Sequence, residues 1–150
     1  MPSPTFLASF GLIGLRLIAL HGLDPQRFVG ELGLPGTSPA DADARLPSGL
    51  LDQAFELAMQ RIPDTAFALR AGECWHPSHL GTLGYAWLSS GSLRTALRRM
   101  ERHTRLLGQR MTSRCEEAAD GLRDVFDHGR GATPVGYALA DYHLSIVVST

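Results

Sequence analysis

Five aromatic and imidazole side chains in the middle of the chain form its richest local supply of ligand-binding groups. They are Trp75, His79, Tyr85, Trp87 and His103. Small-molecule pockets are mostly apolar with a few orienting polar groups, and Tyr and Trp combine a large apolar face with a hydrogen-bonding tip. We therefore predict that these five residues line a ligand pocket. The alternative is that they are core or surface residues with ordinary packing.

A second chemistry is offered by the segment CWHPSH at residues 74–79, because Cys74, His76 and His79 are metal- or haem-ligating residue types. A structural zinc site needs four ligands, and the sequence has no second close pair to complete one. Pro77 also breaks any helical register between the two histidines. A haem- or metal-binding sensor that uses His76 or His79 remains an alternative hypothesis. The simpler interpretation is an ordinary loop, and we predict neither a cofactor nor a metal.

Residues that could perform catalysis form no recognisable motif. The sequence has no GxSxG nucleophile elbow, no HExxH metal motif and no cysteine with a protease-like His and Asn arrangement. Carboxylates such as Glu56 and Asp141 are present, but any domain of this size has several. We therefore predict that the chain is not an enzyme and has no catalytic residues.

Two glycines, Gly81 and Gly84, interrupt an otherwise helix-like stretch. A phosphate-binding loop would need a GxGxxG or GKS/T context after a strand, and neither is present. We predict instead that the glycines let another helix pack closely here. The arginines that follow could bind phosphate or a partner domain, but we interpret them as a solvated helix face. They are Arg94, Arg98, Arg99, Arg102 and Arg105.

The composition is typical of one compact domain. The chain has 150 residues, of which 44% are hydrophobic and 19% charged, and its formal net charge is -1. Binding to nucleic acid needs surplus positive charge, so this chain is not expected to bind DNA by itself. Cys74 and Cys115 are interpreted as small, buried, unpaired residues rather than as a disulfide.

The N-terminal apolar run at residues 6–20 is not a targeting or membrane segment in our interpretation. No basic residue precedes it, Arg16 interrupts it, and it is shorter than the ~20 residues that span a bilayer. A buried amphipathic helix accounts for it better. We expect a cytoplasmic protein without a membrane partner.

Helices dominate the elements that must position the candidate residues. Spacings of three and four predict a first helix over residues 6–20. Asp24 is predicted to cap the second helix, residues 35–47 to form a polar connection, Ser48 to cap the third helix and Asp64 a short fourth. The predicted inner face of the first helix carries Phe6, Phe10, Ile13, Leu17 and Leu20.

The next two helices carry the aromatic residues. Ser78 or His79 is predicted to begin a helix that runs to about Leu88, and Ser92 to cap the helix after it. If these helices fold back across the turn at residues 89–92, His103 reaches the aromatic group. The predicted inner stripe of the second of them is Leu93, Leu97, Met100 and Leu107.

In the last part of the chain, the spacing of apolar residues changes from a helical to an alternating pattern. Alternating runs at residues 110–117 and 121–128, with Asp120 and Gly121 between them, predict a hairpin, and a final helix follows from about Thr133. The predicted fold class is α+β: mainly helical, about six or seven helices, with a small antiparallel β-hairpin or sheet near residues 110–128. Because the apolar pattern does not stop, we expect residues 1–150 to be a single domain truncated at its C-terminus.

The order of four segments resembles one known family. The segments are HGLDPQRFVGELGL, ARLPSGLLDQAFELAMQ, DTAFALRAGE and HLGTLGYAWLSSGSLRTALRRMERHTRLL. In the last, Gly-x-Leu-Gly-Tyr is followed by a Ser-Ser pair, a capped helix with Ala-Leu, and a closing Leu pair. Together they resemble, over roughly residues 10–128, the N-terminal arabinose-binding-like sensor domain of AraC-type bacterial transcription regulators. One departure is Thr65, which follows Asp64 where the family pattern has Pro.

The resemblance implies a domain that senses a small molecule, or holds the regulator as a dimer. It implies control of a separate C-terminal DNA-binding domain with two helix-turn-helix units, by a shift of populations on effector binding. The implied partners are an unknown small-molecule effector, a homodimer partner, and promoter DNA through the parent protein alone. Arabinose is not carried over as the ligand, since related regulators answer to diverse amino acids, lipids and metabolites.

Overall fold

The computed structural model describes residues 2–34 and 43–149. The α-helices are α1 (Ala8–Leu20), α2 (Pro25–Glu31), α3 (Ser48–Arg61), α4 (Thr82–Leu88), α5 (Leu93–His103) and α6 (Pro134–Val148). The 3-10 helices are η1 (Phe67–Glu73), η2 (Pro77–Leu80) and η3 (Thr104–Leu106), and the strands are β1 (Thr5–Leu7), β2 (Arg45–Pro47), β3 (Thr112–Ala118) and β4 (Gly121–Asp127).

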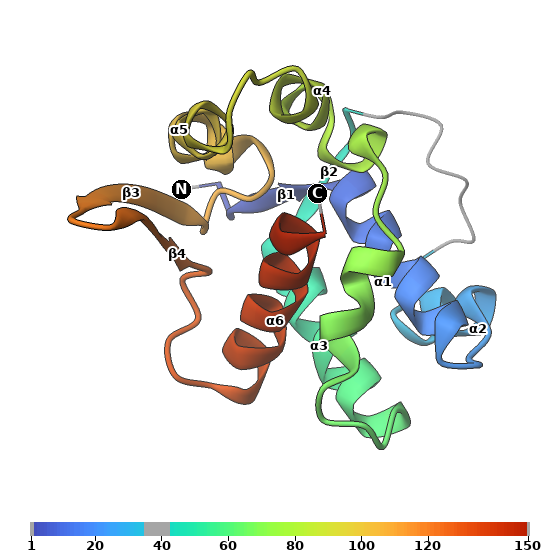
Figure 1. Ribbon diagram of the computed structural model, residues 1–150. Coiled ribbons are helices and arrows are strands. Elements are labelled where there is room, and N and C mark those ends of the chain that lie inside the picture. The colour runs from blue at the N-terminus through green and yellow to red at the C-terminus, as the bar shows by residue number, and fades with distance from the viewer. Residues whose placement is uncertain (1, 35–42, 150) are drawn as a thin grey trace.

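The arrangement is mainly helical, with two small antiparallel sheets, and it confirms the predicted α+β fold class. Figure 1 shows α6 in the middle of the molecule, with α3 and α1 on one side of it and the β3–β4 hairpin on the other. Helices α4 and α5 lie across one end. The core lies where α1, α3, η1 and α6 meet.

The first two strands were not predicted. Phe6 was expected on the first helix, but it is a buried residue of β1, and the helix begins at Ala8. The predicted connection at residues 35–47 is wrong for Arg45–Pro47, which pair with β1 as β2, while residues 35–42 lie outside the described part of the chain. The guanidinium of Arg45 donates to the Thr5 hydroxyl (2.9 Å) and to the Leu106 carbonyl (2.6 Å). This pairing joins residues far apart in the sequence, which no local pattern reveals.

The predicted ends of the first helices are confirmed. Helix α1 ends at Leu20, and Gly22 follows with a φ of 80°. Asp24 caps α2, since its carboxylate accepts from the Gln26 N–H (2.9 Å). One expectation is wrong: Leu20 is 39% exposed, because the inner face of α1 ends one turn earlier.

Helix α3 has the apolar face that its sequence predicts. Leu51, Phe55 and Ala58 are buried, and Ile62 follows them into the core. Ser48 was expected to cap this helix, but it is its first residue and makes no cap bond, because Pro47 occupies the cap position. The short helix after Asp64 is the 3-10 helix η1, and the Asp64 carboxylate accepts from the Ala66 N–H (2.9 Å).

The glycine-containing stretch is two helices rather than one. Gly81 has a φ of 60° and a ψ of -146°, a conformation that L side chains rarely adopt, so no helix continues through it. The predicted start at Ser78 or His79 is therefore wrong: η2 ends at Leu80 and α4 begins at Thr82. Gly84 lies against the backbone of Pro77, so its close packing involves the preceding 3-10 helix. A Cβ atom at Gly81 would lie 3.3 Å from Cδ2 of Leu7 in β1, so at Gly81 the predicted contact with a helix is wrong.

Helix α5 is capped by Ser92, as predicted, whose hydroxyl accepts from the Thr95 N–H (3.2 Å). Leu97 and Met100 are buried, but Leu93 is 64% exposed, so its place on the inner stripe is a wrong prediction. The cap position leaves Leu93 at the open end of the helix. Arg99 secures the turn to α4 by donating to the Ala86 carbonyl (2.6 Å).

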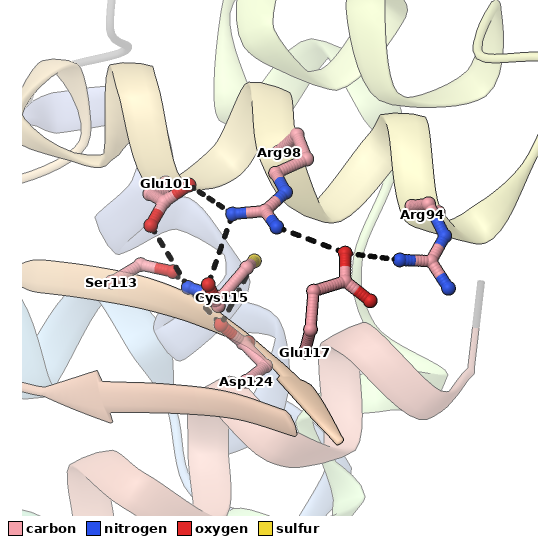
Figure 2. Close-up of polar contacts among 7 residues, drawn as sticks. All are labelled: Arg94, Arg98, Glu101, Ser113, Cys115, Glu117 and Asp124. Atoms are coloured by element: carbon pink, nitrogen blue, oxygen red, sulfur yellow. Dashed lines mark hydrogen bonds and ion pairs between the residues drawn. The ribbon is translucent and has the colours of Figure 1, made fainter. Parts of the chain in front are cut away.

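Arg98 ties α5 to the hairpin, as Figure 2 shows. Its guanidinium donates to the Cys115 carbonyl (2.9 Å), to the Glu101 carboxylate (3.2 Å) and to the Glu117 carboxylate (3.1 Å). Glu101 in turn accepts from the Cys115 N–H (2.9 Å), and this bond, with Arg98 next, lowers the pKa of Glu101. Arg94 also pairs with Glu117. At Arg94 and Arg98 the predicted solvated face is thus an ion-pair network.

The predicted hairpin and final helix are confirmed. Strands β3 and β4 pair antiparallel, with Ala118 opposite Gly121, and Thr133 caps α6 by accepting from the Gly136 N–H (3.1 Å). Cys74 and Cys115 are buried free thiols, as expected. Burial, with Asp124 and Glu101 nearby, raises the pKa of Cys115 to about 11, so this thiol stays protonated and unreactive.

Candidate ligand-binding site

A cavity of about 320 Å³ lies between α1, α2 and α3. This volume is at the lower end of the range of about 300–1,000 Å³ that is usual for small-molecule sites. Each helix supplies apolar side chains to the wall, among them Ile18 from α1, Val29 from α2 and Leu50 from α3. The described wall also includes Phe6 of β1, Leu46 of β2, Phe67 of η1 and Tyr142 of α6, together with Leu34 and Ala44 on either side of residues 35–42.

Small residues on two of the three helices leave this space open. Gly11 and Gly14 line the cavity from α1, and Ala54 and Ala58 line it from α3. A Cβ atom at Gly14 would lie 3.7 Å from the hydroxyl oxygen of Tyr142, which is an ordinary contact. The space therefore comes from short side chains rather than from a backbone conformation that only glycine can adopt.

Tyr142 is the polar side chain in this wall. Its hydroxyl donates to the Phe10 carbonyl (2.9 Å), and burial raises its pKa well above the ordinary value. Its ring packs edge-on against Phe10 and Phe55, with centroids 5.4 Å away in each case. Tyr142 is thus fixed in the core and neutral, and the described residues of the wall offer apolar contact without a group that could transfer a proton near neutral pH.

A wider and more open groove lies on the other side of α6. Its volume is about 860 Å³, and α4, α5, β4 and α6 border it. The residues at its rim are strongly exposed: Leu93 is 64% exposed and Val148 is 74% exposed. Two carboxylates, Asp124 and Asp141, also line it. The groove and the cavity are both partly open to solvent, and the two carboxylates in the groove distinguish its lining from that of the cavity.

Two buried histidines lie at the base of the hairpin. His143 lines the groove, and its ring stacks on Phe126 with centroids 3.4 Å apart. Both ring nitrogens of His128 and Nε2 of His143 are buried without a hydrogen-bond partner among the described residues. Burial lowers the pKa of His128 to about 4 and that of His143 to about 3, with repulsion from Arg130 and from His128 respectively adding to it. Both imidazoles are therefore neutral near pH 7.

The five residues predicted to line a ligand pocket are not gathered in one cavity. Trp87 is buried and lines the groove beside α6. The other four side chains line neither of the two cavities described above. Tyr85 is 56% exposed, His103 is exposed at the end of α5, and Trp75 and His79 are half-buried. Ligand binding by this set stays a prediction, and the geometry assembles a different set around the cavity.

The two histidines of the segment CWHPSH, His76 and His79, form hydrogen bonds that stabilise the turn at the start of η2. His76 caps η2 by accepting from the Ser78 N–H (3.2 Å), while Nδ1 of His79 accepts from the His76 N–H (2.9 Å). Burial lowers the pKa of His79. In residues 2–34 and 43–149, no group of three or more His, Cys, Asp or Glu side chains is placed to hold a metal ion. These contacts give both imidazoles a structural role.

The family model for the N-terminal arabinose-binding domain of AraC transcription regulators matches residues 22–150. The chain belongs to this family. No curated protein matches the chain. The matched range covers α2, α3 and α6, and so includes most of the cavity wall together with Tyr142. It confirms the resemblance seen in the sequence and extends through the final helix.

Membership of the AraC-type family makes the chain an N-terminal regulatory domain that senses a ligand, and the family is not one of enzymes. Among the described helices, none is both long and apolar enough to cross a bilayer.

The cavity residues of this AraC-type domain escaped the sequence analysis. Four small residues were not predicted from the sequence as part of a ligand site, because they lie in stretches that resemble ordinary apolar helices. They are Gly11, Gly14, Ala54 and Ala58. The available signal was the pair of glycines three residues apart inside the first helix. It is ambiguous, because small residues serve close helix packing as well as open space.

Proposed function

We propose that this AraC-type domain binds a small-molecule effector in the cavity between α1, α2 and α3, and that it thereby controls a separate DNA-binding domain that follows Thr150 in the parent regulator. The observation that carries the proposal is the ligand-sized cavity in a domain whose family is defined by ligand binding. The proposal places the protein in the bacterial cytoplasm, where promoter DNA is accessible.

Tyr142 could couple ligand binding in the cavity to the DNA-binding domain. It lines the cavity, and it also lies on α6, the last helix before Thr150. An effector that contacts its ring favours one position of α6 over another, and that difference in binding free energy shifts the population of the whole regulator. A second copy of the chain would meet the exposed apolar side chains of α6, among them Tyr137 and Leu144, and a mass measurement in solution tests this homodimer.

A promoter reporter tests the regulatory role. The parent regulator, a deletion that lacks residues 1–150, and the Ala54→Phe variant are compared across growth media. Ala54 lines the cavity, so a phenyl ring there occupies the effector's space. We expect the response to medium to be lost in the deletion and in Ala54→Phe. A response that survives the deletion would overturn the proposal.

A further inference from the structure

We infer that the cavity binds an uncharged, largely hydrocarbon molecule, about the size of two fused aromatic rings or a ten-carbon chain, and not a free sugar. This inference rests on the proposed effector function. It goes beyond it by naming the chemical class of the ligand, which the family description would suggest to be a sugar.

The wall of the cavity is the first observation. Among the described residues that line it, every side chain apart from Tyr142 belongs to Phe, Leu, Ile, Val, Ala or Gly, and none of these carries a charge. Most of the described lining residues lie within α1, α2 and α3, where backbone N–H and C=O groups away from the helix ends are bonded within the helix. An entering molecule therefore meets almost entirely hydrocarbon.

The second observation is Tyr142, which carries the one polar side chain among the described lining residues. The hydroxyl proton of Tyr142 is already donated to the Phe10 carbonyl (2.9 Å). What remains for a ligand is an acceptor on one buried oxygen. A free sugar carries several hydroxyl groups, and each would give up hydrogen bonds to water without finding a replacement here. The hydrogen bonds that a sugar would lose without replacement make its binding unfavourable, and the cavity therefore favours a ligand with at most one polar group.

The size of the cavity is the third observation. A dry cavity of about 150 Å³ lined by Leu, Ile and Phe holds one benzene ring. At about 320 Å³, this cavity holds roughly twice that molecule. The groove beside α6 is larger, but Asp124 and Asp141 in its wall and its exposed rim make it unsuitable for a hydrocarbon that must leave water.

Thermal unfolding of the purified protein tests the class of ligand, with decanol and naphthalene as apolar probes and L-arabinose as the polar comparison. A ligand that binds only the folded state raises Tm by mass action. For a chain of this length we expect a rise of roughly 5–10 °C when decanol exceeds its Kd by about 100-fold. L-arabinose should leave Tm unchanged.

Two alanine variants locate the site. Ala54→Phe fills the cavity and should weaken decanol binding at least about tenfold, whereas Ala140→Phe, placed in the groove beside α6, should leave binding unchanged. If Ala54→Phe does not fold, nuclear Overhauser effects from decanol to the methyl groups of Ile18, Val29 and Leu50 in the unaltered protein give the same information.

Each contrary result overturns the inference in a recognisable way. A rise in Tm with L-arabinose and none with the apolar probes would show that the class is wrong. Loss of decanol binding in Ala140→Phe alone would move the site to the groove. Absence of binding by both apolar probes would also overturn the inference, yet the regulatory function would stand as long as the promoter response depends on residues 1–150.

Discussion

Gly84 sits where the backbone leaves no room for a side chain. A Cβ atom there would lie 2.0 Å from the carbonyl oxygen of Pro77, a distance that requires the backbone of η2 or α4 to move. We predict that Gly84→Ala lowers the free energy of unfolding by about 1–3 kcal/mol, and that Gly84→Leu lowers it at least as much. Urea unfolding measures both.

The matched control for this prediction is Gly30→Ala. Gly30 also lies within a helix, α2, but nothing lies within 4 Å of a Cβ built on it. Alanine is the better helix former, so this variant should be neutral or more stable by up to about 1 kcal/mol. If Gly84→Ala and the unaltered protein were equally stable, the backbone of η2 would have to move away from the new Cβ atom without any loss in the free energy of unfolding.

His128 and His143 make the stability of the fold depend on pH. Their pKa values of about 4 and about 3 lie below the value of about 6.5 for a histidine in an unfolded chain. Between these values the unfolded chain binds protons that the folded protein excludes. The stabilisation is therefore complete above about pH 6.5, and it is lost progressively as the pH falls toward the folded pKa values.

We predict that acidification from about pH 7 to about pH 5 removes roughly 2 kcal/mol of stability for each of the two histidines. Urea unfolding at both pH values measures the loss. His143→Phe keeps an aromatic ring against Phe126 but cannot take up a proton, so its stability should fall less on acidification. The same fall in this variant as in the unaltered protein would contradict the prediction.

At the scale of elements, the joint between α5 and β3 depends on the planar guanidinium of Arg98. It reaches acceptors on Cys115, Glu101 and Glu117 at once, which a lysine ammonium cannot match in geometry. Because the Arg98 side chain is 41% exposed, solvent screens these bonds and their contribution is modest. We predict that Arg98→Lys lowers the free energy of unfolding by about 1 kcal/mol.

Arg105→Lys is the control for this change at the joint. Arg105 is also an exposed arginine at the C-terminal end of this region, but Glu101 pairs with Arg98. Lysine at position 105 should therefore change the stability by less than about 0.5 kcal/mol. Equal effects of the two substitutions would mean that the network in Figure 2 does not stabilise the joint.

At the scale of the whole molecule, net charge determines whether the chain can bind DNA by itself. The formal net charge is -1, and several arginines of α5 and the hairpin are neutralised by carboxylates, as in the pair between Arg94 and Glu117. Phosphate binding depends on unpaired positive charge. We predict that residues 1–150 alone show no sequence-specific binding to the regulator's promoter in a gel shift. Tight, sequence-selective binding by this domain would contradict the proposed division of labour.

The sequence alone determined most of the helices, two of their caps and the hairpin. Asp24 and Ser92 cap helices as predicted, because a cap bond joins residues two or three apart and its chemistry is local. The strands β3 and β4 were predictable for the same reason, since a short turn joins them. The family could be recognised because such local signals recur in a characteristic order.

Only the tertiary structure revealed the candidate site. The pairing of β1 with β2 joins Thr5 to Pro47, and the cavity depends on helices α1, α2 and α3 leaving a gap that Gly14 and Ala54 do not fill. A small residue in a sequence is compatible with a tight contact and with an open space. The position of the neighbouring helix determines whether a small residue makes a tight contact or borders an open space. That position depends on how the whole core packs. For the same physical reason, the aromatic residues around Tyr85 looked like a pocket in the sequence, although packing leaves Tyr85 itself in solvent.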